Sequence, residues 1–221
     1  MITDELRQKL WDGVNPFAGF PRRLIAEDTQ GWQSQHPFLS DVIEAIRPRV
    51  VIEIGVWKGG STLTMAHKLK DLNIDGAVIA VDTWLGSSEH WLNPEWREDL
   101  CLLNGYPRLF EKFIANIIHP GVGDFVVPLP LDSVNARHVI SHTGIAADMI
   151  HIDGSHDYTA VMTDLIEWWP VLRRRGVLIC DDYFDDGVTW QDVFCAVNDF
   201  LAKTPHVDFA FHGGKCRATK V

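Results

Sequence analysis

Short runs of large aliphatic residues alternate with segments of helical periodicity along most of the chain. Such runs predict strands buried on both faces of a sheet, and the helical segments between them favour parallel pairing. The predicted strands lie at residues 50–55, 77–82, 124–129, 148–153, 177–183, 207–211 and 215–221. The predicted helices lie at residues 37–46, 61–72, 107–118, 133–142, 158–172 and 190–201. We therefore expect an α/β fold, with a doubly wound, mostly parallel seven-stranded sheet that ends in an antiparallel hairpin.

Two segments depart from this pattern. Residues 1–33 form a weakly patterned arm rich in aromatic residues and proline, and residues 84–106 form an insertion that holds three tryptophans. We divide the chain into an N-terminal arm and helix, residues 1–48, and a main domain, residues 49–221. The arm either packs on the core or closes over a ligand as a lid or substrate wall. Its aromatic residues could instead form an interface in a homo-oligomer.

The helix predicted over residues 158–172 contains a proline and ends near a basic run. Pro170 must kink or shorten the helix, and Gly176 supplies its C-terminal stop. Arg173–Arg175 then lies at the helix C-terminus, where positive charge is favourable against the helix dipole.

Composition narrows the class of protein. The chain has 221 residues, 46% hydrophobic and 23% charged, which is ordinary for a globular α/β domain. A formal net charge of −10 argues against binding a nucleic-acid backbone. Four cysteines without Cys-x-x-Cys spacing predict reduced thiols, and we find neither a secretory signal nor an apolar run of membrane-spanning length. We expect a cytoplasmic protein without membrane or nucleic-acid partners.

A glycine-rich turn follows the first predicted strand. Glu53, Gly55 and Gly59 have the spacing Glu-x-Gly-x-x-x-Gly, and Ser61 then begins a helix. Glycines let the backbone approach a ligand, the helix N-terminus offers free N–H groups, and the carboxylate suits a ligand with an ammonium group. The alternative is a turn that closes an ordinary strand–helix unit.

The second predicted strand ends in a carboxylate. Asp82 could accept hydrogen bonds from the two vicinal hydroxyls of a ribose, as acidic residues at this position do in nucleotide-binding folds. It could also be a helix cap or a solvated loop residue. Trp84, two residues on, could stack on an adenine, line a substrate pocket or fill the core.

Three more carboxylates follow the fourth and fifth predicted strands. Asp153, Asp181 and Asp182 should meet at the carboxyl edge of the sheet, where mutual repulsion requires a counter-charge. A hard cation such as Mg²⁺ would supply this charge and could chelate a substrate diol. His156 lies near the same edge and could accept the proton of a hydroxyl, or it could be a cap or surface histidine.

These motifs resemble a known family. The segment from Glu53 to Ser61 is similar to motif I of class I S-adenosylmethionine-dependent methyltransferases, which have a Rossmann-like fold. Asp153–His156 with Asp181 and Asp182 resembles the metal-dependent O-methyltransferases that modify sugars of macrolide and aminocoumarin antibiotics.

The resemblance implies roles for individual residues. It gives cofactor contacts to Glu53, Gly55, Gly59 and Ser61, and the ribose contact to Asp82. It makes Asp153, Asp181 and Asp182 ligands of Mg²⁺, and His156 the catalytic base. The turn after the third strand flanks the adenine in this layout, so Asp132 and Ser133 become cofactor candidates, although Ser133 could equally cap the next helix.

The sequence thus predicts a Mg²⁺-dependent O-methyltransferase that transfers a methyl group from S-adenosylmethionine to a hydroxyl of a sugar or another polyhydroxylated small molecule. One alternative keeps the cofactor and needs no metal, because proximity alone can drive methyl transfer. Another is a non-catalytic binding module with the same fold.

Overall fold

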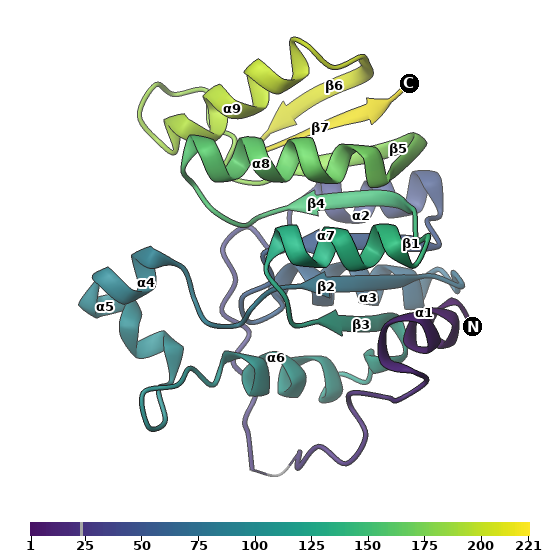
Figure 1. The fold of residues 1–221 in the computed structure, drawn as a ribbon, viewed down its shortest axis with the longest axis vertical. Helices are drawn as coiled ribbons and strands as arrows, with labels where there is room; N and C mark the ends of the chain where they lie inside the picture. Colours follow the sequence, from purple (N-terminus) through teal and green to yellow (C-terminus); the bar gives the residue numbers. More distant parts are fainter. Residues whose placement is uncertain (23) are drawn as a thin grey trace.

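A computed structural model describes residues 1–22 and 24–221 of the chain; Arg23, inside the predicted arm, lies outside the described residues. Its centre is one seven-stranded sheet in the order β3-β2-β1-β4-β5-β7-β6 (Figure 1). The first five strands pair in parallel, and β7 pairs antiparallel with both β5 and β6. The strands are β1 (Val50–Ile54), β2 (Ala77–Val81), β3 (Val126–Leu129), β4 (Ala147–Ile152), β5 (Leu172–Cys180), β6 (His206–His212) and β7 (Lys215–Lys220). The predicted doubly wound α/β fold with its C-terminal hairpin is confirmed.

Helices cover both faces of the sheet. One core cluster packs α1, α7, α8 and α9 against the strands, and two others pack α2, α3 and α6 against the opposite face. The helices are α1 (Ile2–Trp11), α2 (Pro37–Ile46), α3 (Gly60–Asp71), α4 (Ser88–Leu92), α5 (Pro94–Arg97), α6 (Leu109–Ile118), α7 (Ser133–His142), α8 (Tyr158–Trp168) and α9 (Gln191–Leu201), with 3₁₀ turns η1 (Glu98–Leu100), η2 (Gly123–Phe125) and η3 (Trp169–Val171). Among the described residues, no helix combines the length and apolar character needed to cross a bilayer.

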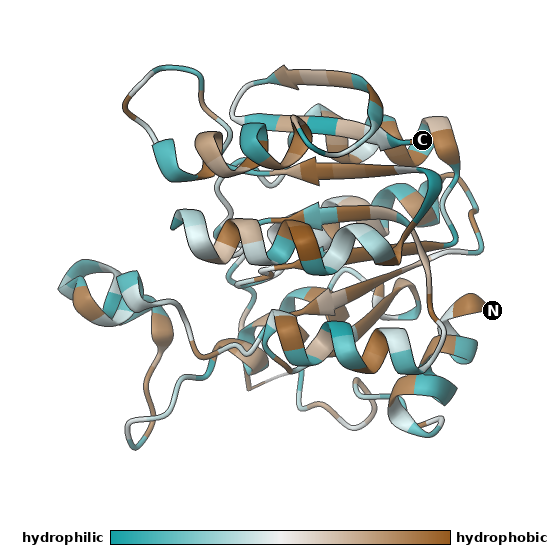
Figure 2. Ribbon diagram, turned by 45° about the horizontal axis from the view of Figure 1, so that its top comes forward, coloured by the Kyte–Doolittle hydropathy of each residue, from teal (hydrophilic) through white to brown (hydrophobic). Residues whose placement is uncertain are grey.

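Strand alternation decides which face each side chain joins. In β1, Ile52 and Ile54 pack toward α7 and α8, whereas Val51 packs toward α2 and α3. Figure 2 shows the central strands as largely hydrophobic and the helices as mixed, as expected for a sheet covered on both faces. By the same alternation, Glu53 lies on the face covered by α2 and α3.

The structure corrects three predictions of local structure. Residues 2–11 form helix α1, which the sequence pattern did not indicate. Its buried face includes Thr3 and Arg7, which donate hydrogen bonds to the carbonyls of Asp124 at 2.6 Å and Gly123 at 2.7 Å. Half of the buried face is therefore polar and invisible to a search for apolar periodicity.

The helix α8 ends at Trp168, because Pro170 turns the chain into the 3₁₀ segment η3, and the predicted shortening of the helix by Pro170 is confirmed. The other two corrections concern the segment that follows. Strand β5 then begins at Leu172, so Gly176 is a strand residue and not a helix stop. The basic run Arg173–Arg175 lies exposed in the strand, where its pairing with β4 is irregular, and the predicted interaction with a helix dipole is wrong.

The insertion contains α4, α5 and η1. Figure 1 shows α4 and α5 standing out from the body of the protein on the side toward which the parallel strands point. This placement puts the insertion beside the carboxyl edge of the sheet, where ligands bind in open α/β folds.

Candidate active site

The turn between β1 and α3 approaches the end of β4. Gly55 has φ of +80°, and a Cβ atom there would lie 1.9 Å from the carbonyl oxygen of Asp153. Gly59 has φ of +88° and caps α3, with Phe113 against its Cα. Both glycines are required by the protein's own packing, and their contact with a cofactor stays a prediction.

Glu53 and Ser61 lie beneath this turn. The buried Glu53 carboxylate accepts hydrogen bonds from the hydroxyls of Ser61 and Thr62, and it lies 3.2 Å from Nδ1 of His151. These contacts fasten the first turn of α3 to the sheet. Because Glu53 is fully buried, its position favours a structural role over direct contact with a ligand's ammonium group.

Asp82 holds the same turn from the end of β2. Its Oδ2 accepts the backbone N–H groups of Val56 at 2.8 Å and Trp57 at 2.9 Å, and its Oδ1 accepts that of Trp84 at 2.7 Å. Burial raises the pKa of this carboxyl, although the three N–H groups oppose the shift. A carboxylate oxygen can accept two hydrogen bonds, so Oδ1 retains capacity for one ribose hydroxyl.

Trp84 lies in the core. Only 2% of the residue is exposed, its ring packs against Phe110 and Phe113, and its Nε1 donates to the carbonyl of Trp57 at 2.9 Å. The indole is therefore enclosed by protein, which favours the core-filling alternative over stacking on an adenine.

Asp132 and Ser133 begin α7. Asp132 is the N-cap, and its Oδ1 accepts the backbone N–H of Asn135 at 3.0 Å. Ser133 donates to the buried carboxylate of Asp164 and accepts from Nε1 of Trp168 at 2.8 Å. Burial raises the pKa of Asp164 to about 6, with the Ser133 hydrogen bond opposing the shift. Capping and packing thus account for both residues, and a cofactor contact stays a prediction.

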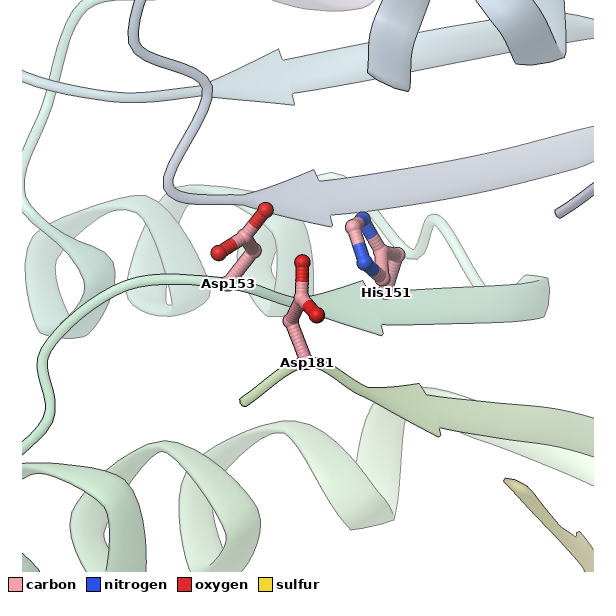
Figure 3. A group of neighbouring side chains, drawn as sticks. All are labelled: His151, Asp153 and Asp181. Atoms are coloured by element: carbon pink, nitrogen blue, oxygen red, sulfur yellow. The ribbon is translucent and has the colours of Figure 1, made fainter. Parts of the chain in front are cut away.

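An acidic cluster lies at the ends of β4 and β5. Ligand atoms of His151, Asp153 and Asp181 all lie within 4.8 Å of one another, and Figure 3 shows the Asp181 carboxylate between Asp153 and the imidazole of His151. Burial and the charge of Asp181 hold the pKa of Asp153 well above its usual range. The structure thus brings together two of the three predicted metal ligands, and it adds His151, which was not among the predicted ligands.

The third predicted ligand, Asp182, is not part of this cluster and contacts His156 instead. Its Oδ2 lies 2.9 Å from Nε2 of His156, and Nδ1 of the same imidazole lies 3.0 Å from Glu89 Oε2. The ring stacks on Trp190, with 3.9 Å between the ring centroids. Burial lowers the pKa of His156, but the hydrogen bonds and charges of Asp182 and Glu89 outweigh it and leave the pKa raised.

The sequence did not single out Glu89, which α4 of the insertion brings to His156. It also did not single out two buried lysines. Lys215, the first residue of β7, forms an ion pair with Asp181 and lies 3.3 Å from Nε2 of His151. The only signals for Lys215 were its place after a glycine pair and at the start of a predicted strand.

Lys58, inside the glycine turn, joins both irregular segments to the site. Its Nζ donates to Asp28 at 2.8 Å, Gln30 at 2.7 Å and Asp99 at 2.9 Å. The first two residues belong to the arm and the third to the insertion. One buried ammonium group therefore fixes the arm and the insertion to the turn after β1.

Aromatic rings from the same segments gather beside the turn. Trp57 stacks on His90 with centroids 4.1 Å apart, and Trp32 and Trp96 extend the cluster. Trp32 comes from the arm, and His90 and Trp96 come from the insertion. This aromatic cluster thus lies close to the carboxyl edge of the sheet.

The sheet order, the glycine turn and the carboxylates at successive strand ends define a Rossmann-like methyltransferase fold. The family model described as a methyltransferase domain matches residues 52–183, and the chain belongs to this family. The matched stretch contains Glu53, Asp82, Asp153, His156 and Asp181.

Solved structures share this fold, and one curated protein matches part of the chain. An O-methyltransferase from Bacillus cereus, solved in complex with SAH, is 18% identical with a TM-score of 0.60, and the match covers 100% of both chains. TomG of Streptomyces achromogenes, an O-methyltransferase involved in tomaymycin synthesis and solved with SAM, is 13% identical with a TM-score of 0.61 over 100% of this chain and 90% of TomG. These likenesses show the fold. The protein y4gI of Sinorhizobium fredii is 26% identical over 153 residues, which span 68% of this chain but 15% of that protein.

Proposed function

We propose that the chain is an S-adenosylmethionine-dependent O-methyltransferase whose acceptor is a hydroxyl of a sugar or another polyhydroxylated small molecule. One observation carries this proposal: Asp82 follows β2, and Asp153 and His156 follow β4, the two strands that flank β1, and all three residues lie within the stretch matched to the methyltransferase family. Structural neighbours solved with SAM and SAH support the choice of cofactor.

Bound S-adenosylmethionine would supply an electrophilic methyl group on sulfur. The turn held by Asp82 would receive the cofactor, and Oδ1 of Asp82 would accept a ribose hydroxyl. His156 would accept the acceptor's proton on one ring nitrogen, where the acceptor hydroxyl replaces the carboxylate, while the carboxylate on the other nitrogen orients the ring. The hydrogen bonds and charges of Asp182 and Glu89 raise the pKa of His156, and only the neutral form of the ring can act as a base.

The aromatic cluster supports a small cyclic acceptor. Trp32 and Trp96 lie at its two ends and offer apolar rings, and the carboxylates at the strand ends offer hydrogen-bond acceptors. Sugars present both an apolar ring face and several hydroxyls. Segments fixed by Lys58 would then form the acceptor pocket.

The predicted Mg²⁺ fits the described donors poorly. Asp182 is turned toward His156, both ring nitrogens of His151 face other side chains, and the Lys215 ammonium already contacts Asp181. The contact between Lys215 and Asp181 favours an enzyme that transfers the methyl group without a metal ion.

A methyl-transfer assay tests the proposal. Purified protein, S-adenosylmethionine and a panel of sugars and polyols would be analysed for methylated product and S-adenosylhomocysteine. We expect His156→Gln to lower turnover at least tenfold with little change in cofactor affinity. His142→Gln is the matched control, because His142 is exposed at the C-terminal end of α7, far along the helix from the catalytic edge. Turnover that His156→Gln leaves unchanged would contradict the assigned base.

A further inference from the structure

We infer that Lys215 is the resident cation of this site and takes the place of a divalent metal. The inference rests on the proposed methyltransferase function, because the resemblance to metal-dependent O-methyltransferases is what predicts a metal at Asp153 and Asp181. It concerns a residue of β7 that lies outside the matched family stretch.

Strand register places Lys215 at the site. Cys180 of β5 pairs with Cys216 of β7, so the next residues, Asp181 and Lys215, lie opposite each other. The N–H of Tyr183 donates to the carbonyl of Gly214 at 2.8 Å, which fixes the hairpin at this point. Cys180 and Cys216 belong to the core on the α8 side, so alternation turns Asp181 and Lys215 to the other face.

A row of buried polar groups crosses the sheet on that face. Glu53 of β1 and His151 of β4 are register partners, and Nδ1 of His151 lies 3.2 Å from Glu53. Nε2 of the same ring lies 3.3 Å from Nζ of Lys215, which also contacts Asp181. The Lys215 ammonium can only donate, so Nε2 of His151 must accept its hydrogen bond. Nδ1 of His151 then carries the hydrogen and donates it in a hydrogen bond to the Glu53 carboxylate. Both nitrogens are then occupied, and His151 offers no free lone pair to a metal.

Lys215 satisfies the electrostatic need that a metal would otherwise meet. Its side chain is fully buried, and a buried ammonium is stable only when it is paired. It neutralises Asp181 in the position where the acidic cluster would have required a cation. A divalent ion bound to Asp181 would lie beside this ammonium, and two cations repel strongly where water is excluded. The ion pair therefore excludes the metal from the cluster.

Binding of Mn²⁺, a spectroscopic substitute for Mg²⁺, tests this inference. The full-length protein, freed of metal with a chelator, would be titrated with Mn²⁺ and followed by electron paramagnetic resonance. We expect no stoichiometric site in the wild type. Lys215→Met, which keeps an unbranched side chain one atom shorter and removes the charge, should bind one Mn²⁺ at least tenfold more tightly than the wild type does. The double variant with Asp181→Asn should lose this gain.

The outcomes separate a metal substitute from a residue that only stabilises the fold. A purely structural Lys215 predicts that Lys215→Met loses stability and gains no Mn²⁺, which would overturn the inference. One tight Mn²⁺ in the wild type, removed by Asp181→Asn, would overturn it as well. If Lys215→Met does not fold, the wild-type titration still tests the inference, because one tight Mn²⁺ removed by Asp181→Asn would overturn it. Binding of S-adenosylmethionine is measured separately, so failure of the methyltransferase proposal is distinguishable from failure of this one.

Discussion

Replacing Asp164 by Asn should stabilise the protein at neutral pH. Asp164 lies on α8 with 7% of the residue exposed, and it accepts a hydrogen bond from Ser133. Its pKa rises from an ordinary 3.8 to about 6 on folding. The folded state therefore binds this proton more tightly than the unfolded chain does. Stability is greatest below pH 4, falls as pH rises toward about 6, and is constant above that value.

The size of the effect follows from this shift. Two pKa units correspond to about 3 kcal/mol, which is the destabilisation expected at pH 7.5, against about 1 kcal/mol at pH 4.5. Asn cannot ionise, and its Oδ1 can still accept from Ser133. We thus expect the difference in unfolding free energy between Asp164→Asn and wild type to grow by roughly 2 kcal/mol from pH 4.5 to pH 7.5.

Urea unfolding at several pH values, followed by circular dichroism, measures this difference. Asp132→Asn is a control of opposite sign, because hydrogen bonds from Asn135 lower the pKa of Asp132 and its charge therefore stabilises the fold above the ordinary pKa. A difference between Asp164→Asn and wild type that does not change with pH would refute the reasoning.

Three further predictions concern the site and its supports. Glu89→Gln removes a charge that raises the pKa of His156, so the pH at which turnover is half-maximal should move to lower values; an unmoved profile would exclude His156 as the base. Lys58→Met leaves two partly buried carboxylates unpaired and should cost about 3–5 kcal/mol, with faster hydrogen exchange in the arm and the insertion. Gly55→Ala would force a Cβ atom into the carbonyl of Asp153 at positive φ, and we expect a loss above about 3 kcal/mol in thermal unfolding, whereas wild-type stability would contradict the geometry.

The order of strands and helices could be predicted because buried parallel strands and amphipathic helices leave strong periodic patterns. Helices α2 and α7 have the predicted bounds, Pro37–Ile46 and Ser133–His142. The predicted end of a helix was wrong where the apolar spacing of the helix continued beyond its last residue. Leu172 keeps the apolar spacing of α8, yet it is the first residue of β5.

The candidate site was predictable only where a motif carried it. Gly55, Asp82 and Asp153 occur at strand ends, and strand ends are visible in sequence. Lys215 and Glu89 are not part of a local pattern, because Lys215 reaches His151 across 64 residues and Glu89 reaches His156 across 67. The pairing of strands β5 and β7 and the course of the insertion decide these contacts, and single-sequence patterns contain neither.

The most direct test of the account is a calorimetric titration of S-adenosylmethionine into the purified, folded protein. The account predicts saturable binding at one site per chain. Asp82→Asn should weaken this binding, because it removes the charge of the carboxylate that holds the turn and, in the proposed function, accepts a ribose hydroxyl. A folded wild-type protein that shows no binding would contradict the central claim that the turn after β1 receives this cofactor.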